Sequence, residues 1–193
     1  YLVMTATNAG GGVLALNGTK LINEVSVEIG GQEIDKQSGV WIQMWLDLTN
    51  NSDKTNMLGE MGVQEVDAST TSKKLYLPLQ FWFCRNPGLA LPLIALQYHE
   101  VKFKIEFNPA LKNNGGGADS TAMTCELWCD YIYLDTDERR RFAQTSHEYL
   151  IEQLQANRGN CTKENMKVKL NFNHPIKELV WVHDGSCGGF DYK

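Results

Sequence analysis

The alternation of apolar and polar residues with a period of two is the feature that most constrains how this chain can fold. In one segment Val101, Phe103, Ile105 and Phe107 alternate with two lysines and a glutamate. Successive side chains of a β-strand point to opposite faces, so this pattern predicts a strand with one face in the core and one in water. Strands that are wet on one side are typical of antiparallel sheets.

The same signal recurs along the chain. Residues 25–29 alternate and end in a Gly-Gly pair, which predicts a strand followed by a turn. Residues 123–133 and 166–172 also alternate, and the first of these segments becomes apolar on both faces toward its end. Residues 74–83 form an apolar and aromatic run, which predicts a strand buried on both faces.

Helical signals are few and short. One apolar stripe has the spacing of a helix face and consists of Trp41, Met44, Trp45 and Leu48. Ser38 is a suitable N-cap for that helix. Residues 135–141 place acids before bases, which suits the dipole of a one- or two-turn helix. Residues 147–155 are ambiguous between strand and helix, and the polar residues 50–72 predict a surface excursion.

Many strands joined by long polar connections and short helices predict a mainly β fold, an antiparallel β-sandwich. Residues 157–160, Asn-Arg-Gly-Asn, have the composition of a linker, so we place a domain boundary near residues 150–160. The chain opens inside a strand pattern and closes without a terminal element. We therefore expect it to be an internal segment of a longer protein.

Composition excludes several classes of protein. The net charge of −5 argues against a dedicated nucleic-acid-binding domain, because such domains are usually basic. The longest strongly apolar stretch, residues 88–96, is far shorter than the ~20 residues that span a bilayer. Five irregularly spaced cysteines do not indicate a disulfide framework, so we expect free, buried thiols.

No group of residues predicts a catalytic, cofactor or metal site. Cys125 and Cys129 are four residues apart on a predicted strand, so about 13 Å would separate them, too far for one tetrahedral metal. The four histidines are scattered and no H-E-x-x-H motif occurs. The sequence therefore predicts neither an enzyme nor a bound cofactor.

Two weaker signals concern modification and contacts. Asn17, Asn50 and Asn160 begin Asn-x-Ser/Thr sequons and are possible glycosylation sites. The arginines Arg139, Arg140 and Arg141 follow three acidic residues, so pairing within a helix turn explains them most simply. Salt bridges at a subunit interface are the alternative role for these arginines.

Three long stretches carry a family resemblance: VSVEIGGQEIDK at 25–36, NPGLALPLIALQYHEV at 86–101, and DYIYLDTDERRRFAQ at 130–144, continued by HEYLIEQLQ at 147–155. LNFNHP at 170–175 follows in the expected order. Together they resemble the major capsid proteins of nucleocytoplasmic large DNA viruses, in particular the algal-virus branch. The resemblance covers roughly residues 20–183.

This resemblance implies a viral double jelly roll. Residues 1–150 would form the first jelly-roll domain without its N-terminal strands, 151–165 a linker, and 166–193 the start of an incomplete second jelly roll. It also implies a structural shell protein whose homotrimers form pseudo-hexagonal capsomers that tile an icosahedral virion. Partners would be neighbouring capsomers and minor capsid proteins, with an inner viral membrane nearby, no membrane span, no direct nucleic acid binding, and assembly in the host cytoplasm.

Two other functions fit a β-sandwich. A carbohydrate-binding module would use exposed aromatic residues, for which the candidates are Trp41, Trp45, Trp82 and Trp181. A metal-dependent jelly-roll enzyme is the weaker alternative, because the sequence lacks the metal-ligand spacing of that class.

Overall fold

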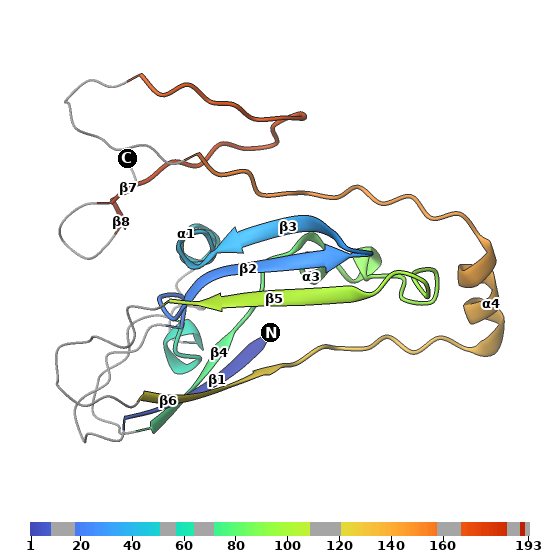
Figure 1. Ribbon diagram of the computed structural model, residues 1–193, viewed down its shortest axis with the longest axis horizontal. Helices are drawn as coiled ribbons and strands as arrows, with labels where there is room; N and C mark the ends of the chain where they lie inside the picture. Colours follow the sequence, from blue (N-terminus) through green and yellow to red (C-terminus); the bar gives the residue numbers. More distant parts are fainter. Residues whose placement is uncertain are drawn as a thin grey trace. The chain divides into compact units, whose positions relative to one another are not determined.

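The computed structural model describes residues 1–8, 18–50, 57–63, 72–108, 121–157, 167–184 and 190–191. The chain divides into two compact units, Tyr1–Gln153 and Leu154–Lys193. The first unit holds most of the regular structure (Figure 1). The domain boundaries expected from the family resemblance stay a prediction.

Two three-stranded antiparallel sheets form the first unit. One sheet has the strand order β4-β1-β6, and its strands are β4 (Ser72–Leu77), β1 (Leu2–Asn8) and β6 (Thr121–Leu127). The other has the order β3-β2-β5, and its strands are β3 (Gln32–Ser38), β2 (Ile22–Ile29) and β5 (Val101–Phe107). Each central strand therefore has an antiparallel neighbour on both sides.

The core lies between these sheets. Both sheets contribute fully buried side chains to a single apolar cluster, among them Leu2, Met4, Leu75, Leu77, Val25 and Val27. On β5 the half-buried and exposed residues alternate along the whole strand, as its sequence predicts. The predicted mainly β fold is confirmed: two antiparallel sheets form a sandwich, and short helices lie in their connections.

A tight turn joins β2 to β3 where the sequence predicts one. Gly30 and Gly31 have φ of 60° and 83°, a conformation that residues with a Cβ rarely adopt. A Cβ on Gly30 would lie 2.6 Å from Nδ1 of His99, whereas one on Gly31 would meet nothing within 4 Å. Gly30 is thus required both for its backbone conformation and for the close approach of His99.

Helix α1 (Gly39–Thr49) begins where the sequence predicts, because the Ser38 Oγ accepts a hydrogen bond from the Trp41 N–H at 3.2 Å. The predicted apolar stripe is only partly correct. The residues that α1 buries are Gly39, Ile42, Met44 and Leu46, whereas Leu48 is 49% exposed. Helix α4 (Thr136–Gln144) covers the predicted acid-then-base segment.

The prediction of a strand buried on both faces over residues 74–83 is wrong. Strand β4 ends at Leu77, and its residue Tyr76 is 37% exposed, so only one face is buried. Pro78 follows immediately and has no N–H to donate to a sheet ladder, which explains the end of the strand. The later part of the run forms a helical turn, α3 (Trp82–Arg85), and the 3-10 turn η1 (Pro87–Leu89) comes next.

The expectation of a surface excursion over residues 50–72 also needs correction where the structure describes that segment. Leu58 and Val63 are 5% and 2% exposed and belong to the core cluster. The Met61 carbonyl accepts a hydrogen bond from the Tyr76 N–H at 2.8 Å, which ties this segment to β4. The Gly62 carbonyl also accepts a hydrogen bond from the Gly18 N–H at 2.9 Å, so backbone contacts and buried apolar side chains hold residues 57–63 against the core.

The second unit has little regular structure in its described residues. Strands β7 (His183–Asp184) and β8 (Phe190–Asp191) pair antiparallel. Side chains tie its first residues to a later segment: the Asn157 amide donates to the Lys169 carbonyl at 2.8 Å. The described part of the predicted strand at 166–172 forms no strand, because no ladder partner is present among the described residues of this unit.

Candidate assembly surfaces

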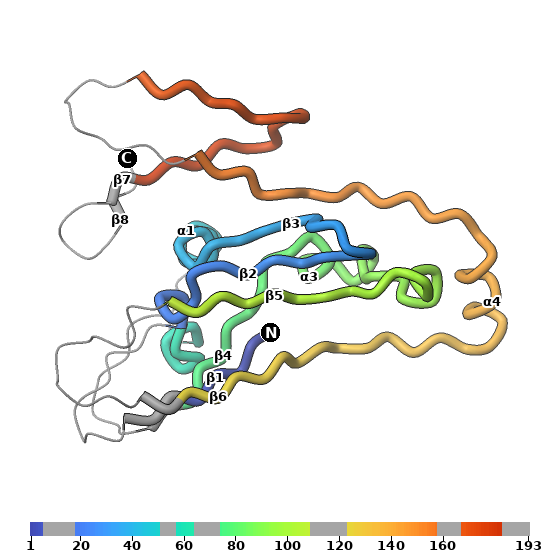
Figure 2. The backbone as a smooth tube through the Cα atoms, in the orientation of Figure 1, coloured from blue at the N-terminus to red at the C-terminus, as the bar shows by residue number. Residues whose placement is uncertain are grey.

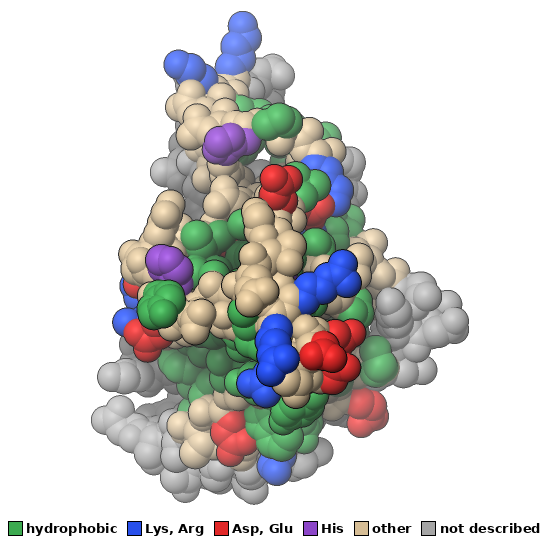
Figure 3. Space-filling view, turned by 90° about the vertical axis from the view of Figure 1, so that its right-hand side faces the viewer, with side chains coloured by type: hydrophobic (Ala, Val, Ile, Leu, Met, Phe, Trp, Pro, Cys, Tyr) green, Lys and Arg blue, Asp and Glu red, His purple; other side chains and the backbone are tan. Residues whose placement is uncertain are grey.

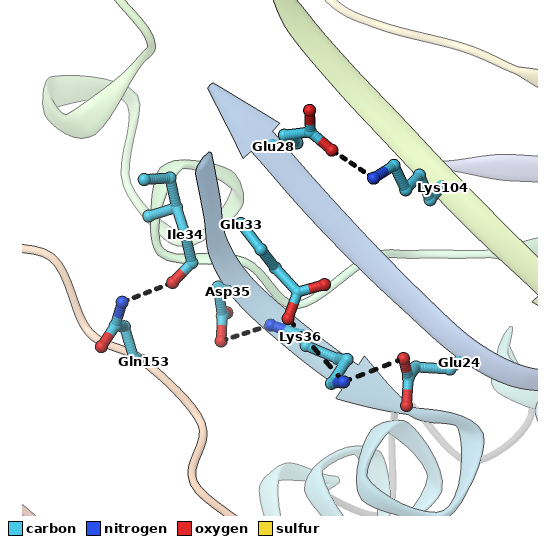
Figure 4. A network of polar contacts seen from close by, with 8 residues as sticks. All are labelled: Glu24, Glu28, Glu33, Ile34, Asp35, Lys36, Lys104 and Gln153. Carbon is cyan, nitrogen blue, oxygen red and sulfur yellow. Dashed lines mark hydrogen bonds and ion pairs between the residues drawn. The ribbon is translucent and has the colours of Figure 1, made fainter. Parts of the chain in front are cut away.

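The outer face of the sheet β3-β2-β5 carries a charged ladder, which we define as Glu24, Glu28, Glu33, Lys36 and Lys104 (Figure 4). Because Val25 and Val27 point into the core, the alternating positions of β2 place carboxylates on the opposite face. The Lys36 ammonium on β3 lies 3.3 Å from Glu24 and 3.7 Å from Glu33, and Lys104 on β5 pairs with Glu28.

The ion pairs shift the pKa of Glu28 and of Lys36 toward the charged form. The hydrogen bond from Lys104 lowers the pKa of Glu28, and the hydrogen bond to Glu24 raises the pKa of Lys36. At the start of β5, the Lys102 ammonium lies 3.0 Å from Glu100, which raises the pKa of Lys102. The ladder therefore presents carboxylates and ammonium groups side by side on this face.

The inner face of β3 holds a buried polar group. Asp35 and Gln37 are 4% and 2% exposed and stand opposite the core residues Val27 and Val25. The Gln37 amide donates to Asp35 Oδ2 at 3.1 Å and to the Gln80 carbonyl at 3.0 Å. The Asp35 carboxylate also accepts from the Lys36 N–H at 2.9 Å, so it satisfies a backbone donor of an outer strand.

The extended segment that leads out of the first unit is attached to the sandwich by side chains. The Arg85 guanidinium of α3 lies 2.8 Å from Glu152 and sits over the Trp45 ring, 4.5 Å from its centroid. Gln153 donates its amide to the Ile34 carbonyl of β3 (Figure 4). These side-chain contacts fix residues 152 and 153 beside α3 and β3.

Helix α4 lies between two extended segments, residues 128–135 and 145–153 (Figure 2). None of its residues is buried. Figure 3, which looks toward the α4 side of Figure 1, shows basic and acidic side chains next to each other on this face. The structure supports local pairing for one arginine, since Arg140 lies 3.8 Å from Asp137. An interface role for Arg139, Arg140 and Arg141 stays a prediction.

The segment that follows β6 exposes large apolar side chains instead of becoming buried. The prediction of increasing burial along residues 123–133 is therefore wrong. The structure leaves more than half of each of four side chains exposed: Trp128, Tyr131, Ile132 and Tyr133. The strand ladder ends at Leu127, and no described strand covers the residues beyond it. Large apolar side chains exposed together are typical of interaction surfaces.

The prediction of buried thiols is also wrong for the described cysteines. Cys84, Cys125 and Cys129 are free and exposed. Cys125 belongs to β6, an outer strand of its sheet, where no further described strand shields it. Desolvation nevertheless raises the pKa of the Cys84 and Cys125 thiols, which disfavours the reactive thiolate. Cys161 and Cys187 lie outside the described residues.

Within the described ranges, no group of three His, Cys, Asp or Glu side chains is placed to hold a metal ion. The same residues include no helix with the length and apolar character needed to cross a membrane. Of the tryptophans expected for sugar stacking, Trp82 is 2% exposed, and Arg85 covers the face of Trp45. Only Trp181, 71% exposed, offers an open ring among those four.

The predicted glycosylation sites are not tested by the structure. Asn17 and Asn160 lie outside the described residues. Asn50 is the half-buried C-cap residue of α1.

The contacts of Arg85 with Trp45 and Glu152 were not predicted from the sequence. These three residues are far apart in the chain and share no common motif. The one sequence signal for these contacts is the pair Trp41 and Trp45 on α1, because a partly exposed tryptophan ring can bind a cation such as an arginine side chain.

Two antiparallel sheets share one core, and charged and apolar side chains cover their outer surface. This arrangement defines the class of β-sandwich proteins. Residues 3–135 match the family model described as "Major capsid protein N-terminus". Residues 138–186 match the model described as "Large eukaryotic DNA virus major capsid protein".

Individual relatives agree. The major capsid protein of Pyramimonas orientalis virus is 52% identical over 201 residues, which cover 98% of this chain and 49% of the relative. That of Paramecium bursaria Chlorella virus 1 is 42% identical over 183 residues, covering 89% and 42%. A crystal structure of PBCV-1 VP54, fitted into a cryo-EM reconstruction of the virophage Sputnik, superposes with a TM-score of 0.69 at 41% identity and covers 80% of this chain and 39% of that one.

The chain belongs to the major capsid protein family of large eukaryotic DNA viruses. The resemblance seen in the sequence is thereby confirmed, and so is the viral jelly-roll kind of the sandwich. The chain spans about half the length of the curated relatives it matches, or less.

Proposed function

We propose that the protein containing this chain is the structural subunit of an icosahedral virion shell. Three copies would form a capsomer of pseudo-hexagonal outline, and capsomers would tile the shell. The observation that carries this proposal is the family match over residues 3–135 together with the superposition on a capsid protein over 80% of the chain. The relatives bear the name of capsid proteins, which implies a structural role rather than an enzymatic one.

The proposed layout has residues 1–150 as part of the first jelly roll, 151–165 as a linker and 166–193 as the start of a second. The division of the chain after Gln153 supports a boundary in this region. The exposed segment 128–135 supports the view that the first roll needs further strands, since unpaired strand edges and apolar side chains seek partners. The rest of the full-length protein would supply them.

The proposed partners are other copies of the protein, neighbouring capsomers and minor capsid proteins. Assembly would take place in the host cytoplasm, with an inner membrane near the shell and no direct contact with nucleic acid. The charged ladder, with three carboxylates and two ammonium groups, and the net charge of −5 support contacts with proteins rather than with a polyanion.

Sizing with light scattering, followed by electron microscopy, tests the function on the full-length protein. We expect a stable trimer whose images show three-fold symmetry and six lobes, with interfaces well beyond ~1,000 Å² each. A protein that stays monomeric at micromolar concentration would contradict the proposal. Binding to a glycan array that is lost on Trp181→Ala would instead support the carbohydrate-binding module.

A further inference from the structure

Helix α4 is well formed although it buries nothing. The Asp135 carboxylate accepts a hydrogen bond from the Glu138 N–H at 2.8 Å, and the Arg141 carbonyl accepts one from the Thr145 N–H at 3.0 Å. Short helices without an apolar face are marginal on their own. Closing both ends therefore compensates for the packing that this helix lacks.

The turn after α4 is fixed as well. The His147 ring lies 5.1 Å from the Phe142 ring, and its Nε2 donates to the Phe142 carbonyl at 2.7 Å. A second aromatic residue, Tyr149, lies 6.4 Å from His147. The helix is thus held in a defined orientation relative to the segment that leaves it. Such fixing is useful where a helix must present its side chains to another molecule.

The charges of α4 are segregated along its axis. Three carboxylates come first, on Asp135, Asp137 and Glu138, and three guanidiniums follow, on Arg139, Arg140 and Arg141. Asp137 and Arg141 are four residues apart, so they share one face, to which Arg140 is also close. This face is open, because the Asp137 and Arg140 side chains are 93% and 73% exposed.

Little within the described chain uses this face. Its one ion pair joins Arg140 to Asp137 at the long distance of 3.8 Å. Arg141 forms no ion pair with any residue that the structure describes, although its charge suits the helix C-terminus. The face therefore runs from negative to positive with most of its charge available for a partner.

We propose that α4 packs antiparallel against α4 of a second copy of this chain, with Asp137 of each copy paired with Arg141 of the other. An antiparallel arrangement brings the acidic half of each helix to the basic half of its mate, whereas a parallel arrangement brings like charges together. The contact has two-fold symmetry, since the same patch serves both copies.

This contact would lie between capsomers. A trimer with three-fold symmetry contains no two-fold axis, so a two-fold contact joins one trimer to the next. The inference therefore rests on the proposed function. It predicts that trimer formation and trimer–trimer association respond differently to substitutions in α4.

The test uses four variants of the full-length protein: Arg141→Asp, Asp137→Arg, the double variant D137R/R141D, and Arg139→Asp as the control. Sizing with light scattering measures the trimer, and sedimentation at low salt measures association of trimers. Each single substitution at 137 or 141 places like charges opposite each other and should weaken trimer–trimer association about tenfold while leaving the trimer intact. The double variant should restore association, because the reversed pairs are again complementary.

The controls distinguish specific pairing from an effect of net charge. The two single variants change net charge in opposite directions, so a loss that they share is not a net-charge effect. Arg139 points away from the Asp137–Arg141 face, so Arg139→Asp should change association much less. Unchanged association in the single variants, or a double variant as weak as they are, overturns the inference. If the unmodified protein forms no trimer, the proposed function fails instead.

Discussion

Two paired residues in one sheet show how burial differs between the core of the first unit and its exposed region, residues 127–153. Leu2 of β1 and Leu127 of β6 stand directly opposite each other, yet Leu2 is fully buried and Leu127 is 38% exposed. The region around Leu2 belongs to the core between the two sheets, whereas no residue from Leu127 to Gln153 is buried. Alternation in the sequence thus sets the backbone conformation, but burial depends on a second layer.

The largest effect is expected in the buried region. Phe81 is fully buried and its ring lies 5.6 Å from the Phe83 ring and 6.1 Å from the Phe103 ring. Phe81→Ala should lower the free energy of unfolding by about 3–5 kcal/mol, through lost burial and the cavity left behind. Urea-induced unfolding of the 193-residue chain measures this change.

The matched substitution in the exposed region sharpens the comparison. Tyr133 is 92% exposed, so Tyr133→Ala should change the stability of the 193-residue chain by less than ~0.5 kcal/mol. In the assembled full-length protein the same substitution should be clearly destabilising if further strands cover this segment. An equal, negligible effect in both proteins would contradict the proposed completion of the first roll.

A second pair of substitutions compares a crowded glycine with an open one. A Cβ on Gly39, the first residue of α1, would lie 2.2 Å from the Thr19 carbonyl oxygen and 2.3 Å from that of Ile22. Gly39→Ala should therefore destabilise the chain by about 1–3 kcal/mol, because backbone must move. Gly59 has nothing within 4 Å of its Cβ position, and Gly59→Ala should be neutral or slightly stabilising in the same unfolding measurement.

The sequence predicted the elements that depend on local pattern. Alternation identified β2 and β5, the Gly-Gly pair identified the turn between β2 and β3, and Ser38 identified the start of α1. It did not predict the end of β4, although Pro78 was a visible signal for it. A residue without an N–H decides where a ladder stops, and an apolar run alone does not.

The alternation of apolar and polar residues does not predict how deeply a side chain is buried or which distant residues are in contact. The apolar pattern of residues 123–133 was interpreted as an increasingly buried strand, but nothing described covers Tyr131 or Tyr133. The cysteine spacing, which indicates no disulfide framework, also predicts a buried thiol at Cys125, and the structure exposes it. Some contacts join residues from separate elements, as Arg85 and Glu152 do, and a single sequence does not show which distant residues meet.

A smaller effect is expected where the two regions are joined. Arg85 contacts the Trp45 ring and pairs with Glu152 through side chains that are 28% and 35% exposed. Arg85→Ala should cost about 1 kcal/mol, since partly exposed ion pairs and cation–π contacts contribute at this level. Comparing the single variants R85A and E152A with the double variant isolates the energy of the pair. Strictly additive effects would show that the two side chains do not stabilise each other.

The smallest effect concerns the pH dependence of the charged ladder. The pKa of Glu28 is lowered by Lys104, so its contribution is present above the ordinary Glu value of about 4.3 and is lost as pH falls through the lowered pKa. The pKa of Lys36 is raised by Glu24, so its contribution is present below about 10.4 and is lost as pH rises through the raised pKa. Thermal unfolding of K104A against the unmodified chain should differ slightly near neutral pH and converge once the pH is well below the lowered pKa of Glu28. A difference that persists in strong acid would show that Lys104 stabilises the sheet by something other than its charge.

The inward-facing carboxylate of β3 has a consequence for behaviour under crowding. Open strand edges let neighbouring molecules fuse through their backbones, a hazard that grows with local concentration. On β3 the Asp35 side chain already occupies the Lys36 N–H, and Gln153 occupies the Ile34 carbonyl. A strand from another molecule would have to break both hydrogen bonds before it could pair with β3. The Asp35 carboxylate would then lose the Lys36 N–H as a donor. Copies of such a protein can crowd together and still keep their separate folds.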